Sequence, residues 1–229
     1  MKAVELVGVS RRYGRNYVLK DVNLTVGEGK AVVLRGGNGA GKTTLLRVLA
    51  TTLRPSRGWG RVFGFDLIKA GPEVRRRVAY LGVLGGSYGG LTAAENLRLA
   101  AILYGKDGSS RTLEALLGRV GLAGARDKPA RAFSSGMRKR LALARLLLAD
   151  ARLLLLDEPY ATLDEDGKRL VDEVLHSAKG EGKTVVMASH DLERATLLAD
   201  SALMIEGGRL WLDDAPASPP TAVMAVGRG

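Results

Sequence analysis

The chain has 229 residues, 46% of them hydrophobic, which suits one large soluble domain or one core with a sizeable insertion. Cysteine is absent, which excludes disulfides and thiolate metal sites, and the N-terminus lacks the pattern of a cleaved secretory signal. The net charge of +11 leaves nucleic acid, an anionic membrane surface and a phosphate-rich ligand open as partners, because charge alone does not separate them. No apolar run approaches the roughly 18 to 20 residues that cross a bilayer, so we expect no membrane-spanning helix.

The first third of the chain predicts a strand, a loop and a helix in direct succession. Apolar residues alternate with polar ones at Val22, Leu24 and Val26, as in a half-buried strand. The continuous apolar run 31–34 is typical of a strand that is buried on both faces. A Gly-rich loop follows at once, and segment 44–50 then predicts a helix.

The middle of the chain predicts helices. Thr92 and Glu95 form a capping box, with a hydroxyl at the N-cap and a carboxylate three positions later. Further helices are predicted over 113–120 and 136–149. We therefore expect residues 85–150 to form a mainly helical insertion between two strand-rich segments.

The last third returns to alternating strands and helices. The apolar runs 153–156 and 184–188 predict two buried strands, with a helix near 166–180 between them. This alternation predicts an α/β fold with a largely parallel sheet. The predicted domain organisation is an α/β core formed by 1–84 and 151–213, a helical subdomain at 85–150, and a loosely ordered tail at 214–229 that is rich in Ala, Pro, Ser and Gly.

A phosphate-binding loop is the clearest motif. The sequence GGNGAGKT at 36–43 fits G-x-x-x-x-G-K-[ST], and it stands after a buried strand and before a helix, as this motif requires. Lys42 can reach the β- and γ-phosphates of a nucleotide, and the Thr43 hydroxyl can hold Mg²⁺. The predicted phosphate-binding residues are Gly36, Gly37, Asn38, Gly39, Ala40, Gly41, Lys42, Thr43 and Thr44.

Three polar residues follow later predicted strands. Asp157 ends the strand at 153–156 and, beside a phosphate-binding loop, is the expected second ligand of Mg²⁺. Glu158 comes next and is the candidate general base that activates the attacking water. His190 closes the strand at 184–188, so it is expected at the same sheet edge, where open α/β folds bind ligands.

Two basic clusters and a serine-rich turn are less specific. The sequence FSSGM at 133–137 begins an amphipathic helix, and its serines could bind an anion at the helix N-terminus. The clusters at 75–77 and 138–140 contain no interleaved aromatic residue, so we interpret both as solvated helix faces.

In combination and order, these motifs resemble those of the ATP-binding subunits of ABC transporters. The phosphate-binding loop, the Ser-Ser-Gly-Met-Arg helix start, the strand that ends in Asp-Glu-Pro and the late Ser-His all match, over about residues 2–213. The Ser-Ser-Gly-Met variant is similar to exporter-type members, including haem exporters of cytochrome c maturation and drug exporters. The resemblance implies a P-loop ATPase fold with an N-terminal antiparallel part and an inserted helical subdomain.

The resemblance also implies roles for particular residues. Residues 133–137 would be the signature loop, in which Ser134, Ser135 and Gly136 contact ATP on a facing subunit. Two chains would pair head to tail around two ATP molecules, as a homodimer or with a second ATPase subunit. Tyr13 would stack on adenine, 162–164 would communicate across the dimer, and His190 would touch the γ-phosphate and orient Glu158.

The resemblance further implies an integral membrane partner, which would dock near 83–92, and a cytoplasmic location at the inner face of the membrane. Leu84 lies nearest the position where the family has a Gln that approaches Mg²⁺ and water. Leucine forms no side-chain hydrogen bond, so Ser87 or a backbone group substitutes, coupling differs, or hydrolysis is slow. The second Gly-rich run, VLGGSYGG at 83–90, lacks anion-binding side chains and is interpreted as a hinge.

Two alternatives remain open. The charge of +11 leaves open a soluble ABC-type ATPase that acts on nucleic acid or ribosomes. Against it, the chain has one set of motifs, no cysteines for a zinc module, and too short a segment between Lys42 and Ser134 for a long coiled coil, so we expect no nucleic-acid partner. A nucleotide-binding regulator with slow turnover is the other alternative, and Leu84 favours it.

Overall fold

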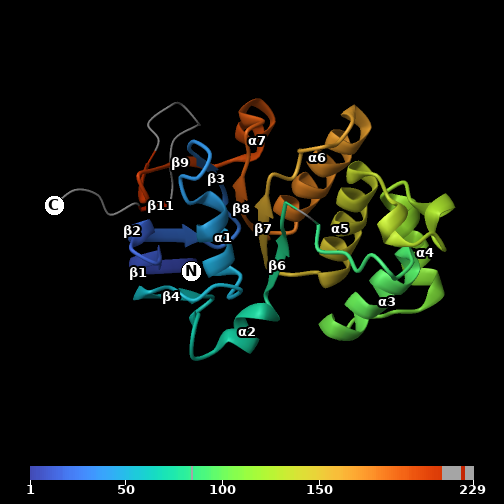
Figure 1. The fold of residues 1–229 in the computed structure, drawn as a ribbon, viewed down its shortest axis with the longest axis horizontal. Helices are drawn as coiled ribbons and strands as arrows, with labels where there is room; N and C mark the ends of the chain where they lie inside the picture. The colour runs from blue at the N-terminus through green and yellow to red at the C-terminus, as the bar shows by residue number, and fades with distance from the viewer. Residues whose placement is uncertain (84, 213–222, 225–229) are drawn as a thin grey trace.

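The computed structural model describes residues 1–83, 85–212 and 223–224, which form two sheets and the helices around them (Figure 1). The first sheet is antiparallel and joins four N-terminal strands and one C-terminal strand in the order β11-β2-β1-β4-β5. Its strands are β1 (Lys2–Tyr13), β2 (Asn16–Gly27), β4 (Arg57–Val62), β5 (Phe65–Asp66) and β11 (Val223–Met224). The antiparallel part expected at the N-terminus is thereby confirmed.

The second sheet is six-stranded and mainly parallel, in the order β10-β9-β3-β8-β7-β6. Only β10 runs antiparallel to its neighbour within this sheet. The buried strands predicted from apolar runs are all present in it. They are β3 (Ala31–Arg35), β7 (Leu153–Asp157) and β8 (Thr184–Ala188), and they are joined by β6 (Val78–Leu81), β9 (Ser201–Glu206) and β10 (Arg209–Leu212).

The helices that the sequence predicts are all present and lie close to their expected positions. Thr92 caps α3, because its hydroxyl accepts from the Glu95 amide at 3.2 Å while the Glu95 carboxylate accepts from the Thr92 amide at 2.8 Å. This is the predicted capping box. The helices are α1 (Lys42–Leu49), α2 (Gly71–Arg75), α3 (Ala93–Tyr104), α4 (Ser110–Arg119), α5 (Ser135–Ala149), α6 (Glu165–Gly180) and α7 (Leu192–Leu198), with short 3₁₀ turns at Ala123–Ala125 and Ala130–Ala132.

The two faces of the parallel sheet are covered by different elements. Helix α1 and the antiparallel sheet pack on one face, where Leu46 belongs to the same cluster as Leu155. Helices α5 and α6 pack on the other face, and α3 and α4 pack on α5 farther from the sheet (Figure 1), so that Leu97 and Leu141 share a cluster with Leu154. Each such buried leucine contributes about 1.5–3 kcal/mol of hydrophobic stabilisation. Because the second cluster runs unbroken from the helical segment into the sheet, the predicted boundaries at 85 and 150 stay a prediction.

One predicted surface is wrong. The cluster 138–140 was expected to be a solvated helix face, but Lys139 is buried with 3% of its surface exposed. The reason is that α5 packs on both sides, and position 139 faces the segment that follows β7. By contrast, Arg75 and Arg76 are exposed, as expected for the other basic cluster.

Some expectations concern residues on which the structure is silent. Leu84 lies outside the described residues, and so does the predicted tail except for 223–224, where Val223 pairs with Val26. None of the helices in the described ranges is both long enough and apolar enough to cross a membrane.

Candidate nucleotide-binding site

The carboxyl ends of three parallel strands meet at one edge of the sheet. Leu34 of β3 and Asp157 of β7 both lie opposite Ala188 of β8 in the strand register. The Gly-rich loop, the acidic pair and His190 follow these three strand ends. Residues that are far apart in sequence are therefore gathered at the edge where open α/β sheets bind ligands.

The Gly-rich loop needs glycine at two positions for steric reasons. A Cβ on Gly36 would lie 2.2 Å from the Ile205 carbonyl oxygen, and one on Gly41 would lie 2.9 Å from the Val18 carbonyl oxygen. Both residues also have positive φ, at 142° and 116°, which glycine adopts at low cost. The loop is thus a backbone cradle that ends at the N-terminus of α1, where a phosphate is favoured.

Lys42 lies inside this cradle. It is the first residue of α1, and its ammonium donates to the Gly36 oxygen at 2.6 Å and to the Gly37 oxygen at 3.1 Å. Phosphate oxygens are stronger acceptors for an ammonium than neutral carbonyls. The predicted phosphate-binding residues Gly36, Gly37, Asn38, Gly39, Ala40, Gly41, Lys42, Thr43 and Thr44 are therefore placed together as one loop and the first turn of one helix.

The predicted metal ligands lie side by side. The Thr43 hydroxyl donates to Asp157 Oδ1 at 3.1 Å, and Asp157 is 1% exposed. A hydroxyl and a carboxylate are oxygen ligands that Mg²⁺ accepts together with nucleotide phosphates. The residues present therefore fit a Mg²⁺ ion that is bound along with the nucleotide.

Tyr80 completes the surroundings of this carboxylate, and the sequence reasoning missed it. Its hydroxyl donates to Asp157 Oδ2 at 3.2 Å from the neighbouring strand β6. Burial, together with the negative charge of Asp157, raises the pKa of Tyr80 to about 12, so the phenol remains a proton donor at neutral pH. The sequence held one signal for this contact, the alternation of side chains along a strand. It directs Tyr80 and Asp157 to the same face of the sheet.

Glu158 and His190 are also brought together. The His190 amide donates to Glu158 Oε2 at 3.1 Å, and the His190 ring nitrogen Nε2 lies 3.5 Å from Oε1. The Glu158 amide donates to the Ala188 oxygen at 2.9 Å, which ties the residue to the end of β8. Its φ of 51° is in the left-handed region, which is uncommon for a residue other than glycine. This geometry places a carboxylate and an imidazole where a water molecule can be activated.

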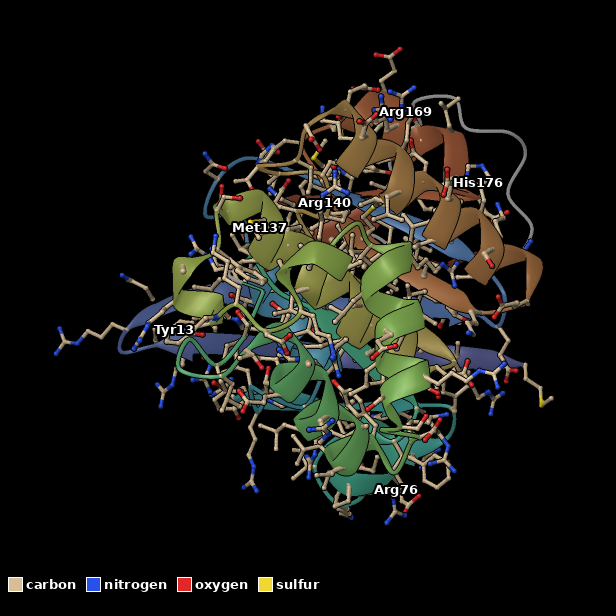
Figure 2. All side chains as sticks on the ribbon, turned by 90° about the vertical axis from the view of Figure 1, so that its right-hand side faces the viewer. Tyr13, Arg76, Met137, Arg140, Arg169 and His176 are labelled. Atoms are coloured by element: carbon tan, nitrogen blue, oxygen red, sulfur yellow. The ribbon has the colours of Figure 1, made fainter. Side chains whose placement is uncertain are left out.

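The predicted signature residues are not part of the site formed by the phosphate-binding loop, Asp157 and Glu158. Ser134 caps α5 by accepting from the Met137 amide at 3.2 Å, and Ser134 and Ser135 are exposed. A Cβ on Gly136 would lie 3.3 Å from the Thr162 oxygen, so the turn contacts the segment after Glu158. Helix α5 lies on the sheet face opposite α1, and Met137 and Arg140 are labelled on it in Figure 2. Within the described ranges, no hydrogen bond joins these residues to the phosphate-binding loop.

The predicted adenine contact has a competitor. Tyr13 is exposed at the end of β1, where the Arg11 guanidinium lies 4.7 Å from the centre of its ring (Figure 2). The cavity of about 400 Å³ beside the phosphate-binding loop is instead lined by Tyr17 and Val18 of β2. Sequence reasoning missed Tyr17, because nothing local separates it from Tyr13.

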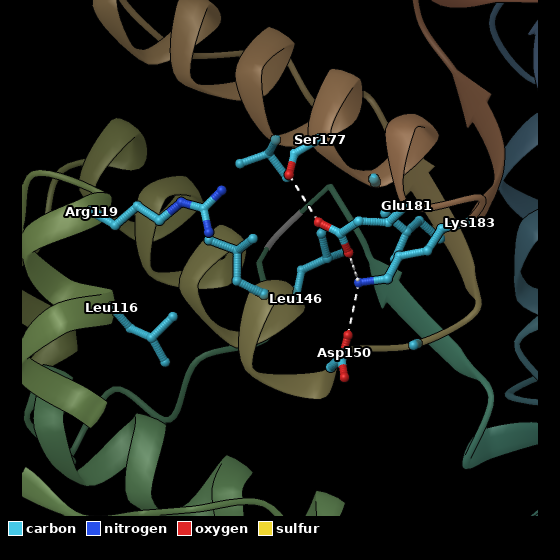
Figure 3. A pocket seen from close by; sticks show the side chains of 12 residues that line it. Leu116, Arg119, Leu146, Asp150, Ser177, Glu181 and Lys183 are labelled. Carbon is cyan, nitrogen blue, oxygen red and sulfur yellow. Dashed lines mark hydrogen bonds and ion pairs between the residues drawn. The ribbon is translucent and has the colours of Figure 1, made fainter. Parts of the chain in front are cut away.

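A further cavity, of about 190 Å³, lies at the opposite edge of the sheet between α4, α5 and α6 (Figure 3). Asp150 and Lys183 precede β7 and β8 there, and the Lys183 ammonium lies 2.8 Å from carboxylate oxygens of both Asp150 and Glu181. The Ser177 hydroxyl donates to Glu181 at 2.9 Å. Since these charges are already paired with one another, this cavity is a poorer candidate for a phosphate ligand.

Comparisons with known proteins agree with this geometry. The sequence profile described as "ABC transporter" matches residues 19–161. NatA of Bacillus subtilis (strain 168), an ABC transporter ATP-binding protein, is 38% identical over 90% of this chain and 87% of its own length. DrrA of Streptomyces peucetius, a daunorubicin/doxorubicin resistance ATP-binding protein, is 35% identical over 91% of this chain and 64% of its own length. The chain thus spans slightly less than two thirds of this second relative.

Solved structures extend the comparison to the whole fold. The ATP-binding subunit of an ABC transporter superposes with a TM-score of 0.85 at 30% identity, covering 93% of this chain and 90% of that one. A dimeric ATP-binding cassette, in a post-hydrolysis state bound to ADP and Pi, gives 0.83 at 25% identity and covers 90% and 96%. The chain therefore belongs to the ABC transporter family, as an ATP-binding and ATP-hydrolysing subunit.

Proposed function

We propose that the carboxyl edge of the parallel sheet binds MgATP and hydrolyses it, and that the energy drives export through a separate membrane protein. The observation that carries this proposal is the meeting of three pairs of groups at one edge. Lys42 lies in the glycine cradle, Thr43 contacts Asp157, and His190 contacts Glu158. These are the groups needed to hold phosphates, a metal ion and a reacting water.

In this proposal each group has a distinct task. Lys42 and the N-terminus of α1 donate to phosphate oxygens and stabilise the charge that develops on them. Thr43 and Asp157 hold Mg²⁺, which would neutralise part of the phosphate charge. Glu158 accepts a proton from the water as its oxygen bonds to the γ-phosphorus and the bond to ADP breaks. His190 holds the Glu158 carboxylate in place.

We further propose that hydrolysis requires two chains. Ser134, Ser135 and Gly136 lie on the face of the sheet opposite α1, which supports their contact with ATP on a partner copy rather than on their own chain. The resemblance to a dimeric ATP-binding cassette supports the same arrangement. Two residues are candidates for contact with the adenine ring. Family resemblance favours Tyr13, whereas the lining of the cavity favours Tyr17.

The direction of transport follows from the relatives. They include a cytochrome c biogenesis ATP-binding export protein of Methylococcus capsulatus, 39% identical, and a Nod factor export ATP-binding protein of Cupriavidus pinatubonensis, 34% identical. We propose that the chain acts at the cytoplasmic face of the membrane with an integral partner. Val83 and Tyr88 are exposed in the segment where docking is expected.

Replacing Glu158 by Gln tests this assignment. The amide oxygen of Gln can still accept from the His190 amide, so the local geometry should be kept while the base is lost. General-base catalysis contributes about 10²–10⁴-fold, so kcat for phosphate release should fall by that range. ATP binding, measured by fluorescence titration, should remain intact.

A second readout in the same experiment is association. Gel filtration of Glu158→Gln with MgATP should give a dimer, because ATP persists between the two subunits. Arg169→Gln is a matched control, since Arg169 pairs with Asp166 on the exposed side of α6 and should keep wild-type turnover. Hydrolysis by Glu158→Gln at the wild-type rate would remove Glu158 from the role of base.

A further inference from the structure

Lys139 is a buried lysine for which the proposed mechanism has no use. It lies in α5 with 3% of its surface exposed, and no ion pair involves it in the part of the chain that the structure describes. Its neighbours point elsewhere, because Arg138 donates to the Phe133 oxygen and Arg140 to the Asp164 carboxylate. Burial of an ammonium group is costly unless polar groups receive it. The environment of Lys139 therefore calls for an explanation.

Two backbone carbonyls receive the ammonium. Lys139 Nζ donates to the Glu158 oxygen at 2.9 Å and lies 3.5 Å from the Val83 oxygen. Burial lowers the pKa of Lys139, while the charges of Asp157 and Glu158 act in the opposite direction. The stronger of its two contacts is therefore a charge-assisted hydrogen bond to the main chain of Glu158.

The main chain of Glu158 is strained and held at three points. Its φ of 51° lies in the left-handed region that residues with a Cβ rarely adopt. Its amide donates to Ala188, and its carbonyl accepts from the Ala161 amide at 3.2 Å and from Lys139. Lys139 is the side chain among these partners. Without it, one main-chain hydrogen bond would remain at that carbonyl.

We propose that Lys139 is a positioning residue for ATP hydrolysis, whose ammonium holds the carbonyl of Glu158 and so keeps its carboxylate directed at His190. The inference rests on the proposed function, in which Glu158 accepts the proton of water. Arg140 anchors the far end of the same segment, since its guanidinium lies 2.8 Å from Asp164. Helix α5, which begins at Ser135, is thus attached to both ends of segment 158–164.

The test replaces Lys139 by Met, which has a similar length but no donor, in the full 229-residue chain. Loss of a charge-assisted hydrogen bond that orients the base should lower kcat about ten- to hundredfold. Lys139 contacts no phosphate-binding residue, so its loss should not weaken the binding of MgATP itself. The KM for MgATP should therefore stay within about twofold of the wild-type value. Lys139→Arg and Lys139→Gln keep an N–H donor and should recover part of kcat.

Lys183→Met is the matched control. It also removes a lysine of low exposure and its contacts with Asp150 and Glu181, but at the opposite edge of the sheet. Thermal unfolding of both variants separates a loss of stability from a loss of turnover. Lys183→Met should lower the melting temperature while keeping kcat.

A double variant distinguishes positioning from general support. In the Glu158→Gln background, Lys139→Met should cause little further loss, because Lys139 acts through the missing carboxylate. The inference is overturned by wild-type kcat in Lys139→Met, by an equal loss in the donor-retaining variants, or by a full further loss in the double variant. If Lys139→Met does not fold, Lys139→Gln decides, and it must show a reduced kcat with unchanged KM. A fully active Glu158→Gln would instead refute the proposed function itself.

Discussion

The pair formed by Tyr80 and Asp157 yields a prediction about stability. Tyr80→Phe removes one hydroxyl and leaves the ring in place, so that, among the residues that the structure describes, Thr43 remains the hydrogen-bond donor to the buried Asp157 carboxylate. A hydrogen bond to a charged group contributes about 1.5–3 kcal/mol. For a chain of this size, that loss corresponds to a melting temperature lower by about 3–12 °C.

The difference between the two proteins should depend on pH in a defined window. The pKa of Tyr80 is raised from 10.0 to about 12 by burial and by the charge of Asp157. Between these values the unfolded tyrosine releases its proton while the folded one keeps it, so the wild type loses stability as pH rises. Its advantage over Tyr80→Phe is therefore full below pH 10 and declines from about pH 10 to 12.

Urea unfolding of both proteins at pH 8, 10 and 11, followed by circular dichroism, measures this difference. Tyr104→Phe is the control, because Tyr104 lines the same cavity as Tyr80 but has no described hydrogen bond to a carboxylate. If Tyr80→Phe lowers the free energy of unfolding at pH 8 by no more than Tyr104→Phe does, the hydrogen-bond argument is refuted. If the difference in the free energy of unfolding between wild type and Tyr80→Phe does not change with pH, the raised pKa of Tyr80 is refuted.

Two further predictions concern nucleotide binding. Because Tyr17 lines the cavity and Tyr13 does not, Tyr17→Ala should weaken ATP binding by about tenfold and Tyr13→Ala by less, as measured by titration. A larger loss in Tyr13→Ala would return the adenine contact to Tyr13. Gly36→Ala should lower the melting temperature and abolish ATP binding, since its Cβ would lie 2.2 Å from the Ile205 oxygen. Gly37→Ala, whose Cβ meets nothing within 4 Å, should keep the wild-type melting temperature, and equal melting temperatures for the two variants would contradict the steric argument.

Local chemistry made much of the site predictable from sequence. The phosphate-binding loop is contiguous, and its glycines, Lys42 and Thr43 act within a few residues of one another. Alternating or continuous apolar runs and the Thr92 capping box likewise depend on neighbours in sequence, so strands and helices could be placed before the structure was known. The position of Asp157 and Glu158 after a buried strand placed them at the sheet edge by topology alone.

Only the tertiary structure decided which side chains from distant segments meet. Lys139 stands between two arginines, and helical periodicity does not tell which residue of a basic cluster finds buried carbonyls. Tyr80 reaches Asp157 because β6 and β7 pair in one register across the helical insertion, and Tyr17 reaches the cavity beside the phosphate-binding loop through the register of β2. Sequence patterns therefore determined the elements and the contiguous loop, whereas packing between elements determined the partners of Asp157 and Glu158, because those contacts join segments that are far apart along the chain.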